Sequence, residues 1–211
     1  MTKKLSGLYA ITNENLMPEK HFLSMAEAAI SSGISILQYR DKSTDKNKRQ
    51  RQASALKKLC DKHNVFFIIN DDINLVTQVD ADGIHIGIND CSIEETRDLI
   101  GTDKIIGVSC YNRMDLAIDA INKGANYIAF GSFFGSSIKP DAPRASSELI
   151  STFKHQSSLP VCCIGGITIE NHQPLLDAGT DMLAVISDIF AQRNDEEISR
   201  KCAQYKNLFN T

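Results

Sequence analysis

Residues 65–72 read Val-Phe-Phe-Ile-Ile-Asn-Asp-Asp, a short apolar run that ends abruptly in one amide and two carboxylates. Such a run, rich in β-branched and aromatic side chains, is typical of a strand that is covered on both faces. Polar side chains directly after it lie at the carboxyl end of the strand, where parallel α/β proteins place their sites. The same unit recurs along the chain.

The apolar runs alternate with helix-compatible segments. The runs occupy Gly7–Ile11, Ile34–Tyr39, Val65–Ile69, Asp82–Ile86, Ile105–Val108, Asn126–Phe130, Pro160–Ile164 and Asp181–Ile186. Eight β-then-α units predict a closed parallel (β/α)8 barrel, the TIM barrel of the α/β class. An open doubly wound sheet is the alternative. It would be favoured by a Gly-x-Gly-x-x-Gly turn after the first run, which instead ends in Ala10-Ile11-Thr12-Asn13.

The overall composition is that of an ordinary globular chain. Of 211 residues, 42% are hydrophobic and 23% are charged, and the net charge of −3 gives no reason to expect a nucleic-acid partner. No segment approaches the roughly 18 apolar residues that a membrane span needs, and no apolar stretch follows the N-terminal lysines. We therefore expect one domain over residues 1–211, in the cytoplasm and without a membrane partner.

Local signals predict several details of the elements. Ser92-Ile93-Glu94-Glu95 reads as a capping box, and Thr168 is a plausible cap before Ile169. Adjacent Cys162 and Cys163 should point to opposite faces of a strand, and the six cysteines are expected to be small buried or half-buried thiols without disulfides. Three glycines between a helical pattern and a strand suit left-handed helix ends, namely Gly33, Gly124 and Gly179.

The residues that follow the runs form one chemical inventory. Arg40 and Lys42 follow the second run and Lys139 follows the sixth, and these three cations suit phosphate oxygens. Asp71 and Asp90 follow the third and fourth runs. Two carboxylates suit a hard cation such as Mg2+, which usually bridges to substrate phosphates. The pattern predicts a cationic, metal-assisted phosphate zone.

A second zone is made of backbone. Gly165-Gly166 follows the seventh run and Ser187 follows the eighth, where barrels commonly build a phosphate site. Glycine permits close approach, so that N–H groups there could cradle a phosphate. His85 lies within a core run, and we expect it to make a structural hydrogen bond rather than to act in catalysis.

Ordinary structural explanations compete with these roles. Arg40 and Lys42 lead into the basic stretch 46–51, which we expect to be a solvated helix face. Asp71 could cap the next helix, although Asp72 is a good candidate for that task. The position at strand ends favours a functional role for Arg40, Lys42 and Asp71.

Seven motifs occur in order along the chain. They are Gln38-Tyr39-Arg40-Asp41-Lys42, Ile69-Asn70-Asp71-Asp72, Asp80-Ala81-Asp82-Gly83-Ile84-His85-Ile86-Gly87, Gly107-Val108-Ser109, Gly131 through Lys139, Ile164-Gly165-Gly166-Ile167-Thr168 and Ala184-Val185-Ile186-Ser187. This ordered set resembles the thiamine phosphate synthase family from about Gly7 to Phe190. The family fold is a (β/α)8 barrel, in agreement with the eight runs.

The resemblance implies a transferase that joins hydroxymethylpyrimidine diphosphate to hydroxyethylthiazole phosphate, giving thiamine phosphate and diphosphate by a dissociative route. It implies that the pyrimidine diphosphate is held by Gln38, Tyr39, Arg40, Asp41, Lys42, Asn70, Ser109 and Lys139. Among these, the implied catalytic residues are Arg40, Lys42, Ser109 and Lys139. It implies Mg2+ on Asp71 and Asp90. It implies that the thiazole phosphate is held by Ser136, Ser137, Ile138, Gly166, Ile186 and Ser187. Family members are often oligomeric, which leaves a homo-oligomer open.

Two stretches depart from the family pattern. Phe134-Gly135-Ser136-Ser137-Ile138-Lys139 stands where the family reads close to Phe-Pro-Thr-x-Thr-Lys, so Ile138 replaces a hydroxyl and Gly135 loosens the loop. Ile88 and Asn89 replace the usual Gln-Glu or Gln-Asp before Asp90. We expect weaker binding of the thiazole phosphate without loss of activity, and we regard the loop Ser132–Ser147 as a lid candidate.

Three rival functions remain open. A thiazole tautomerase shares this barrel but lacks the diphosphate and metal set, so the retained Arg40, Lys42 and Asp71 argue against it. A non-catalytic paralogue would bind thiamine phosphates without turnover, and the Ile138 departure keeps it open. A sugar phosphate epimerase would need a paired acid and base, which the sequence does not place.

Overall fold

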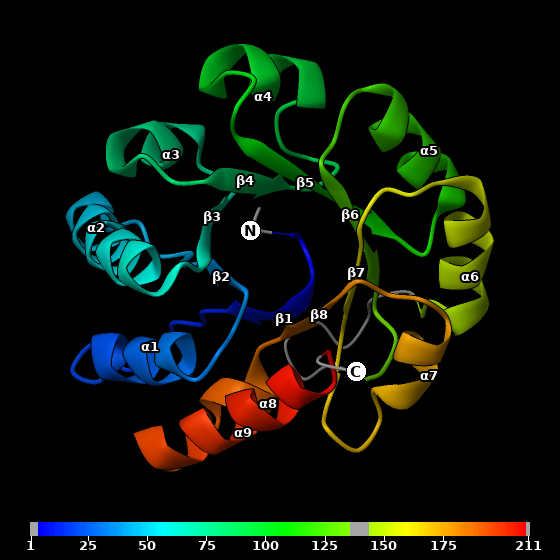
Figure 1. Ribbon diagram of the computed structural model, residues 1–211. Helices are drawn as coiled ribbons and strands as arrows, with labels where there is room; N and C mark the ends of the chain where they lie inside the picture. Colours follow the sequence, from blue (N-terminus) through cyan, green and yellow to red (C-terminus); the bar gives the residue numbers. More distant parts are fainter. Residues whose placement is uncertain (1–3, 136–143, 210–211) are drawn as a thin grey trace.

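The barrel predicted from the sequence is confirmed. A computed structural model describes residues 4–135 and 144–209. The strands of this part of the chain close into a parallel barrel in sequence order, with β8 paired to β1 (Figure 1). They are β1 (Gly7–Ile11), β2 (Ile36–Tyr39), β3 (Phe66–Asn70), β4 (Gly83–Ile86), β5 (Ile105–Tyr111), β6 (Tyr127–Gly131), β7 (Val161–Ile164) and β8 (Met182–Val185).

The helices form a ring outside the strands, as Figure 1 shows. The described helices are α1 (Phe22–Ser31), α2 (Lys46–His63), α3 (Ile73–Val79), α4 (Ile93–Ile100), α5 (Met114–Asn122), α6 (Ser147–Gln156), α7 (Gln173–Asp177), α8 (Ser187–Phe190) and α9 (Asp195–Asn207). The C-terminal α9 packs against α1 and α8. Among the described helices, none combines the length and the apolar character that crossing a membrane requires.

Two hydrophobic layers lie on the two faces of the barrel wall. Inside the barrel, Ile36, Ile68 and Met182 are fully buried in one cluster, while the outward-facing strand residues pack against the helices in a second. Cys162 belongs to the inner cluster and Cys163 to the outer one, so the predicted opposite orientation is confirmed. All six cysteines are free, and Cys91 alone is exposed.

Most of the predicted element ends are confirmed. The Ser92 side chain and Glu95 form the expected capping box on α4, and Asp72 accepts a hydrogen bond from Leu75 N at the start of α3. The three predicted glycines have φ values between 80° and 100°, in the left-handed region, and they are Gly33, Gly124 and Gly179.

One local prediction was wrong, and a second is confirmed only in part, since Lys46 and Arg51 are exposed as expected. No helix begins at Ile169, because Thr168 N donates to Asn171 Oδ1 (2.8 Å) and closes a turn that delays α7 to Gln173. The basic start of α2 is not simply solvated. Lys48 and Arg49 keep about a fifth of their side chains exposed and form ion pairs with acidic residues that follow β2 and β3.

Candidate functional site

A pocket lies at the carboxyl ends of the strands. It has a volume of about 190 Å3, and its lining comes from residues on or after every strand of the barrel. The predicted site residues that line it are Gln38, Arg40, Asn70, Ser109, Gly166, Ile186 and Ser187. Strand-end residues from distant parts of the sequence are therefore brought together, as the barrel topology requires.

A chain of hydrogen bonds crosses the floor of the pocket. Gln38 Nε2 donates to Tyr9 Oη (2.7 Å), which lies 2.8 Å from Tyr127 Oη. The Tyr127 hydroxyl lies 2.9 Å from His85 Nδ1, and His85 Nε2 lies 2.8 Å from Ser109 Oγ. If each tyrosine donates onward, every link has one donor and one acceptor, and Ser109 keeps its own proton for a ligand.

Burial strengthens the preference of both tyrosines in this network for the protonated form. It raises the pKa of both Tyr9 and Tyr127 well above that of a free tyrosine, so both hydroxyls remain donors at physiological pH. The hydrogen bond expected for His85 is confirmed. The sequence reasoning missed Tyr9 and Tyr127. The signal that could have found them is a hydroxyl-bearing side chain at an inward position of an otherwise apolar strand.

The cationic side of the pocket is built after β2 and β3. Arg40 lines the pocket, and its backbone N–H donates to Thr12 Oγ1 (2.9 Å), which donates back to Arg40 O (3.2 Å). Lys42 Nζ forms an ion pair with Asp71, which also accepts a hydrogen bond from Asn70 Nδ2 (2.6 Å). Thr12, another residue that the sequence reasoning missed, thus fixes the backbone that presents Arg40.

Asp71 and Asp90 lie after the neighbouring strands β3 and β4. Asp71 N donates to His85 O across the β3–β4 pair (3.0 Å), and Asp90 Oδ2 accepts from Gly87 N (2.7 Å). In the hydrogen bonds among the described residues, each carboxylate uses Oδ2 and leaves Oδ1 available.

This donor set suits a magnesium ion. Within residues 4–135 and 144–209, no three His, Cys, Asp or Glu side chains gather as a complete protein-only metal site. Mg2+ typically takes one or two carboxylates together with water and substrate phosphates, so Asp71 and Asp90 fit this ion better than a metal that needs a full protein cage.

Two of the predicted substrate residues point away from the pocket. Tyr39 is 2% exposed in the outer layer, where its hydroxyl donates to Gln52 Oε1 (2.9 Å). Asp41 is also buried. Its carboxylate binds Lys48 Nζ (2.7 Å) and accepts from Ser43 N (2.7 Å). These side chains hold the segment that carries Arg40 against α2.

Replacing Asp41 by asparagine is expected to lower the free energy of unfolding by about 2 kcal/mol at neutral pH, because Lys48 and Ser43 lose a charged acceptor. Burial raises the pKa of Asp41, but hydrogen bonds from Lys48 and Ser43 outweigh burial and hold the pKa below its usual range. The stabilisation is therefore present above the unfolded pKa of about 3.9 and is lost as the pH falls through the lower folded pKa.

Urea unfolding of the two proteins across this pH range measures the effect. A difference in unfolding free energy that is large at neutral pH and vanishes in acid is the expected result. Equal stabilities at neutral pH would show that the Asp41 ion pair contributes nothing.

The opposite side of the pocket is made of glycine backbone. Gly165 and Gly166 both have positive φ values, of 110° and 64°. A Cβ on Gly166 would lie 2.3 Å from Gly135 O, so this loop after β7 packs directly against the loop after β6. Asn171 Nδ2 donates to Gly166 O (2.9 Å) and fixes the turn. Only glycine fits this close approach of two backbones.

Four predicted residues lie outside the described part of the chain. They are Ser136, Ser137, Ile138 and Lys139, in the segment between β6 and α6. The phosphate contacts expected from them, and most of the predicted lid, therefore remain predictions.

The comparisons with known proteins agree with one another. A family model described as thiamine monophosphate synthase matches residues 8–189. The thiamine-phosphate synthase of Thioalkalivibrio sulfidiphilus (strain HL-EbGR7) is 41% identical over 201 residues, which are 95% of each chain. A solved thiamine phosphate pyrophosphorylase from Pyrococcus furiosus has a TM-score of 0.86 at 28% identity and covers 96% of this chain and 94% of that chain.

A more distant structure shares the barrel. The thiamine phosphate pyrophosphorylase from Bacteroides thetaiotaomicron has a TM-score of 0.71 at 15% identity, with 96% of both chains covered, which shows the fold alone. The family model covers most of the sequence, and the relative with 41% identity matches almost all of it. The chain therefore belongs to the thiamine monophosphate synthase family.

Proposed function

We propose that the protein joins hydroxymethylpyrimidine diphosphate to hydroxyethylthiazole phosphate, giving thiamine phosphate and diphosphate. One observation carries this proposal: a single pocket has two different anion-suited sides. In a closed barrel with strands in order, β3 lies opposite β7. Arg40 lines the cationic side, and Lys42 and Asp71 form their ion pair next to it without lining the pocket. This side therefore faces the glycine side with Gly166. Two phosphorylated substrates can approach each other from these two sides.

The cationic side would hold the diphosphate. Arg40 and Lys42 supply positive charge, Asn70 supplies an amide donor, and Lys139 adds a third cation from the loop after β6. Asp71 and Asp90 would hold Mg2+, which when bound neutralises charge that develops on a leaving diphosphate. Tyr39 and Asp41 contribute in this account by holding the backbone on either side of Arg40.

The floor of the pocket would hold the pyrimidine ring. Gln38 and Ser109 end the buried hydrogen-bond chain and offer polar groups to ring nitrogens and the amino group, and Ile11 and Ala129 supply apolar contact. The CH2–O bond breaks heterolytically, and its electron pair leaves with the diphosphate. The remaining pyrimidinylmethyl cation is stabilised by resonance, so no protein nucleophile is needed.

The glycine side would hold the thiazole phosphate. Gly166, Ile186 and Ser187 line the pocket here, and Ser136, Ser137 and Ile138 are expected to complete it from the neighbouring loop. The thiazole nitrogen donates its lone pair to the cationic carbon and forms the new C–N bond. Water would capture the same cation. Apolar walls such as Ile164 and Val185 would therefore shield the cation from water until the thiazole nitrogen attacks it.

The proposal is tested by incubating purified protein with both phosphorylated substrates and Mg2+ and assaying thiamine phosphate by chromatography. We expect product only when both substrates and Mg2+ are present. Conversion of a thiazole precursor into its isomer, without condensation, would favour a tautomerase. Ligand binding without any conversion would favour a thiamine phosphate-binding protein. The proposed setting is the cytoplasm, in keeping with the composition.

A further inference from the structure

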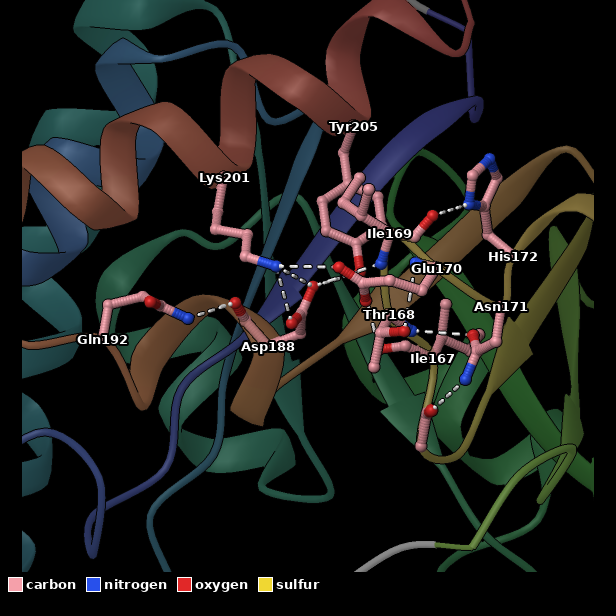
Figure 2. Close-up of polar contacts among 11 residues, drawn as sticks. Ile167, Thr168, Ile169, Glu170, Asn171, His172, Asp188, Gln192, Lys201 and Tyr205 are labelled. Atoms are coloured by element: carbon pink, nitrogen blue, oxygen red, sulfur yellow. Dashed lines mark hydrogen bonds and ion pairs between the residues drawn. The ribbon is translucent and has the colours of Figure 1, made fainter.

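A cluster of charged and polar side chains joins α8 and α9 to the loop after β7 (Figure 2). Asp188, in the first turn of α8, binds Lys201 Nζ from α9 through both carboxylate oxygens (3.0 and 3.3 Å). The Tyr205 hydroxyl, also from α9, donates to Asp188 Oδ2 (2.8 Å). The side chains of Asp188 and Lys201 are 13% and 15% exposed, and Tyr205 is fully buried. None of the three lines the pocket.

Asp188 joins two pocket-lining segments. It directly follows Ser187, and Gln192 Nε2 holds its backbone carbonyl (2.9 Å). Its Oδ2 also accepts from Ile169 N (3.4 Å), in the loop after β7, and Tyr205 Oη lies 3.5 Å from Ile167 O in the same loop. One carboxylate thus fixes the position of the loop after β8 relative to the loop after β7.

Further hydrogen bonds connect this loop to Gly166. Thr168 N donates to Asn171 Oδ1 (2.8 Å), and Asn171 Nδ2 donates to Gly166 O (2.9 Å), as Figure 2 shows for the labelled residues. A chain of contacts therefore runs from α9 to the glycine that lines the pocket. Lys201 also lies 3.8 Å from Glu170 on this loop.

Attachment of α9 does not depend on this cluster alone. Ile198 and Cys202 are completely buried, and α9 packs against α1 as well as α8. The polar cluster instead contacts the two loops of the glycine side, which follow β7 and β8. Buried charged groups that are fully hydrogen-bonded hold a single geometry, which is what a binding site on loops requires.

We propose that Asp188, held by Lys201 and Tyr205, is a positioning residue for the glycine side of the pocket. This inference rests on the proposed function, because it assigns the effect to one of the two substrates. Asp188→Asn keeps the shape of the side chain but removes its charge. The KM for the thiazole phosphate should rise about tenfold, because misplaced loops weaken the phosphate contacts.

The KM for the other substrate and the kinetics of further variants distinguish a positioning role from a general loss of folded structure. The KM for the pyrimidine diphosphate should stay within about twofold, because Arg40, Lys42 and Asn70 lie on the other side of the barrel. Tyr205→Phe removes only one hydroxyl and should raise the thiazole phosphate KM by a smaller factor. Lys201→Arg keeps the cation and should stay close to the wild-type value, whereas Lys201→Met should behave like Asp188→Asn.

Asp181→Asn is the matched control. Asp181 precedes β8 at the other end of the barrel, binds Lys154 Nζ (2.9 Å) and accepts from Val161 N (2.8 Å). It is therefore also a partly buried carboxylate, which joins β8 to β7 through the hydrogen bond from Val161 N and forms an ion pair with Lys154 of α6. Its replacement should lower the melting temperature without changing the KM of either substrate.

Calorimetric titration with hydroxyethylthiazole phosphate gives a second test that needs no turnover. The Kd should rise about tenfold for Asp188→Asn and stay unchanged for Asp181→Asn. If the wild type binds this ligand but forms no product, the proposed function fails while the Kd values still judge the positioning role. The role is overturned if Asp188→Asn and Tyr205→Phe bind like the wild type, if Asp181→Asn weakens binding equally, or if the wild type does not bind the ligand.

Discussion

Replacing Asp71 by asparagine is expected to lower kcat/KM for thiamine phosphate formation by about a thousandfold. The change would weaken the hold on Mg2+ and on Lys42, and one preorganised group that stabilises developing negative charge is worth about 10^2 to 10^3 in rate. Asp71 has two tasks in our account: it is a magnesium ligand, and its carboxylate orients Lys42 and Asn70. Asparagine keeps the size of the side chain and removes the negative charge on which both tasks depend.

Asp72→Asn is the control for this substitution. The neighbouring Asp72 has different partners: it caps α3 through Leu75 N and forms an ion pair with Arg49 of α2 (2.7 Å), and its carboxylate makes no hydrogen bond to Lys42 or Asn70 in the described part of the chain. Its replacement should reduce stability and leave kcat/KM within about threefold of the wild type. Steady-state rates at several Mg2+ concentrations compare the two variants. An Asp71→Asn protein with an unchanged rate and an unchanged Mg2+ requirement would contradict the assignment of Asp71.

Gly107→Ala is expected to destabilise the protein by about 3 kcal/mol, which is the upper range for overpacking a tightly packed interior. A Cβ on Gly107 would lie 1.9 Å from Cζ of Tyr127 and 2.3 Å from its hydroxyl. The ring of Tyr127 would have to move, and its contacts with Tyr9 and His85 would be lost. Activity should therefore fall together with stability.

Gly124→Ala separates crowding from backbone strain. Gly124 has a φ of 80° at the end of α5, and a Cβ there would meet nothing within 4 Å. Its replacement should cost only about 1 kcal/mol of left-handed strain and should leave the kinetics unchanged. Urea unfolding of both variants measures the difference. A Gly107→Ala protein no less stable than Gly124→Ala would show that the barrel interior accommodates the extra methyl group beside Tyr127.

The barrel could be predicted because its physical signal is local. Strands buried on both faces must be apolar throughout, and each parallel crossover needs a helix, so the alternation of short apolar runs with helical segments specifies the topology. The end of β5 was harder to predict. The strand continues to Tyr111 past an irregular pairing with β6 after Ser109, and such a bulge depends on the neighbouring strand rather than on the run itself.

The site could be predicted in position but not in orientation. Polar residues after buried strands had to meet at one end of the barrel, which places Arg40, Asn70 and Ser109 at the pocket. Successive side chains on a strand alternate between faces, so the consecutive motif Gln38–Lys42 cannot point entirely inward. Gln38 and Arg40 line the pocket, while Tyr39 and Asp41 face α2.

The supporting contacts could not be predicted from the sequence, because they join residues that are distant along the chain. Tyr9 and Tyr127 are 118 residues apart, and Asp188 meets Lys201 and Tyr205 only after α9 folds back over α8. Such pairings follow from the closed barrel and the helix packing.

Phosphorus NMR follows both products of the proposed condensation in one sample. Purified wild-type protein is mixed with hydroxymethylpyrimidine diphosphate, hydroxyethylthiazole phosphate and Mg2+. Our account predicts that diphosphate and thiamine phosphate appear together in equal amounts, and that neither forms when Mg2+ is chelated. A folded protein that leaves both substrates unchanged, or that releases diphosphate without forming thiamine phosphate, would contradict it.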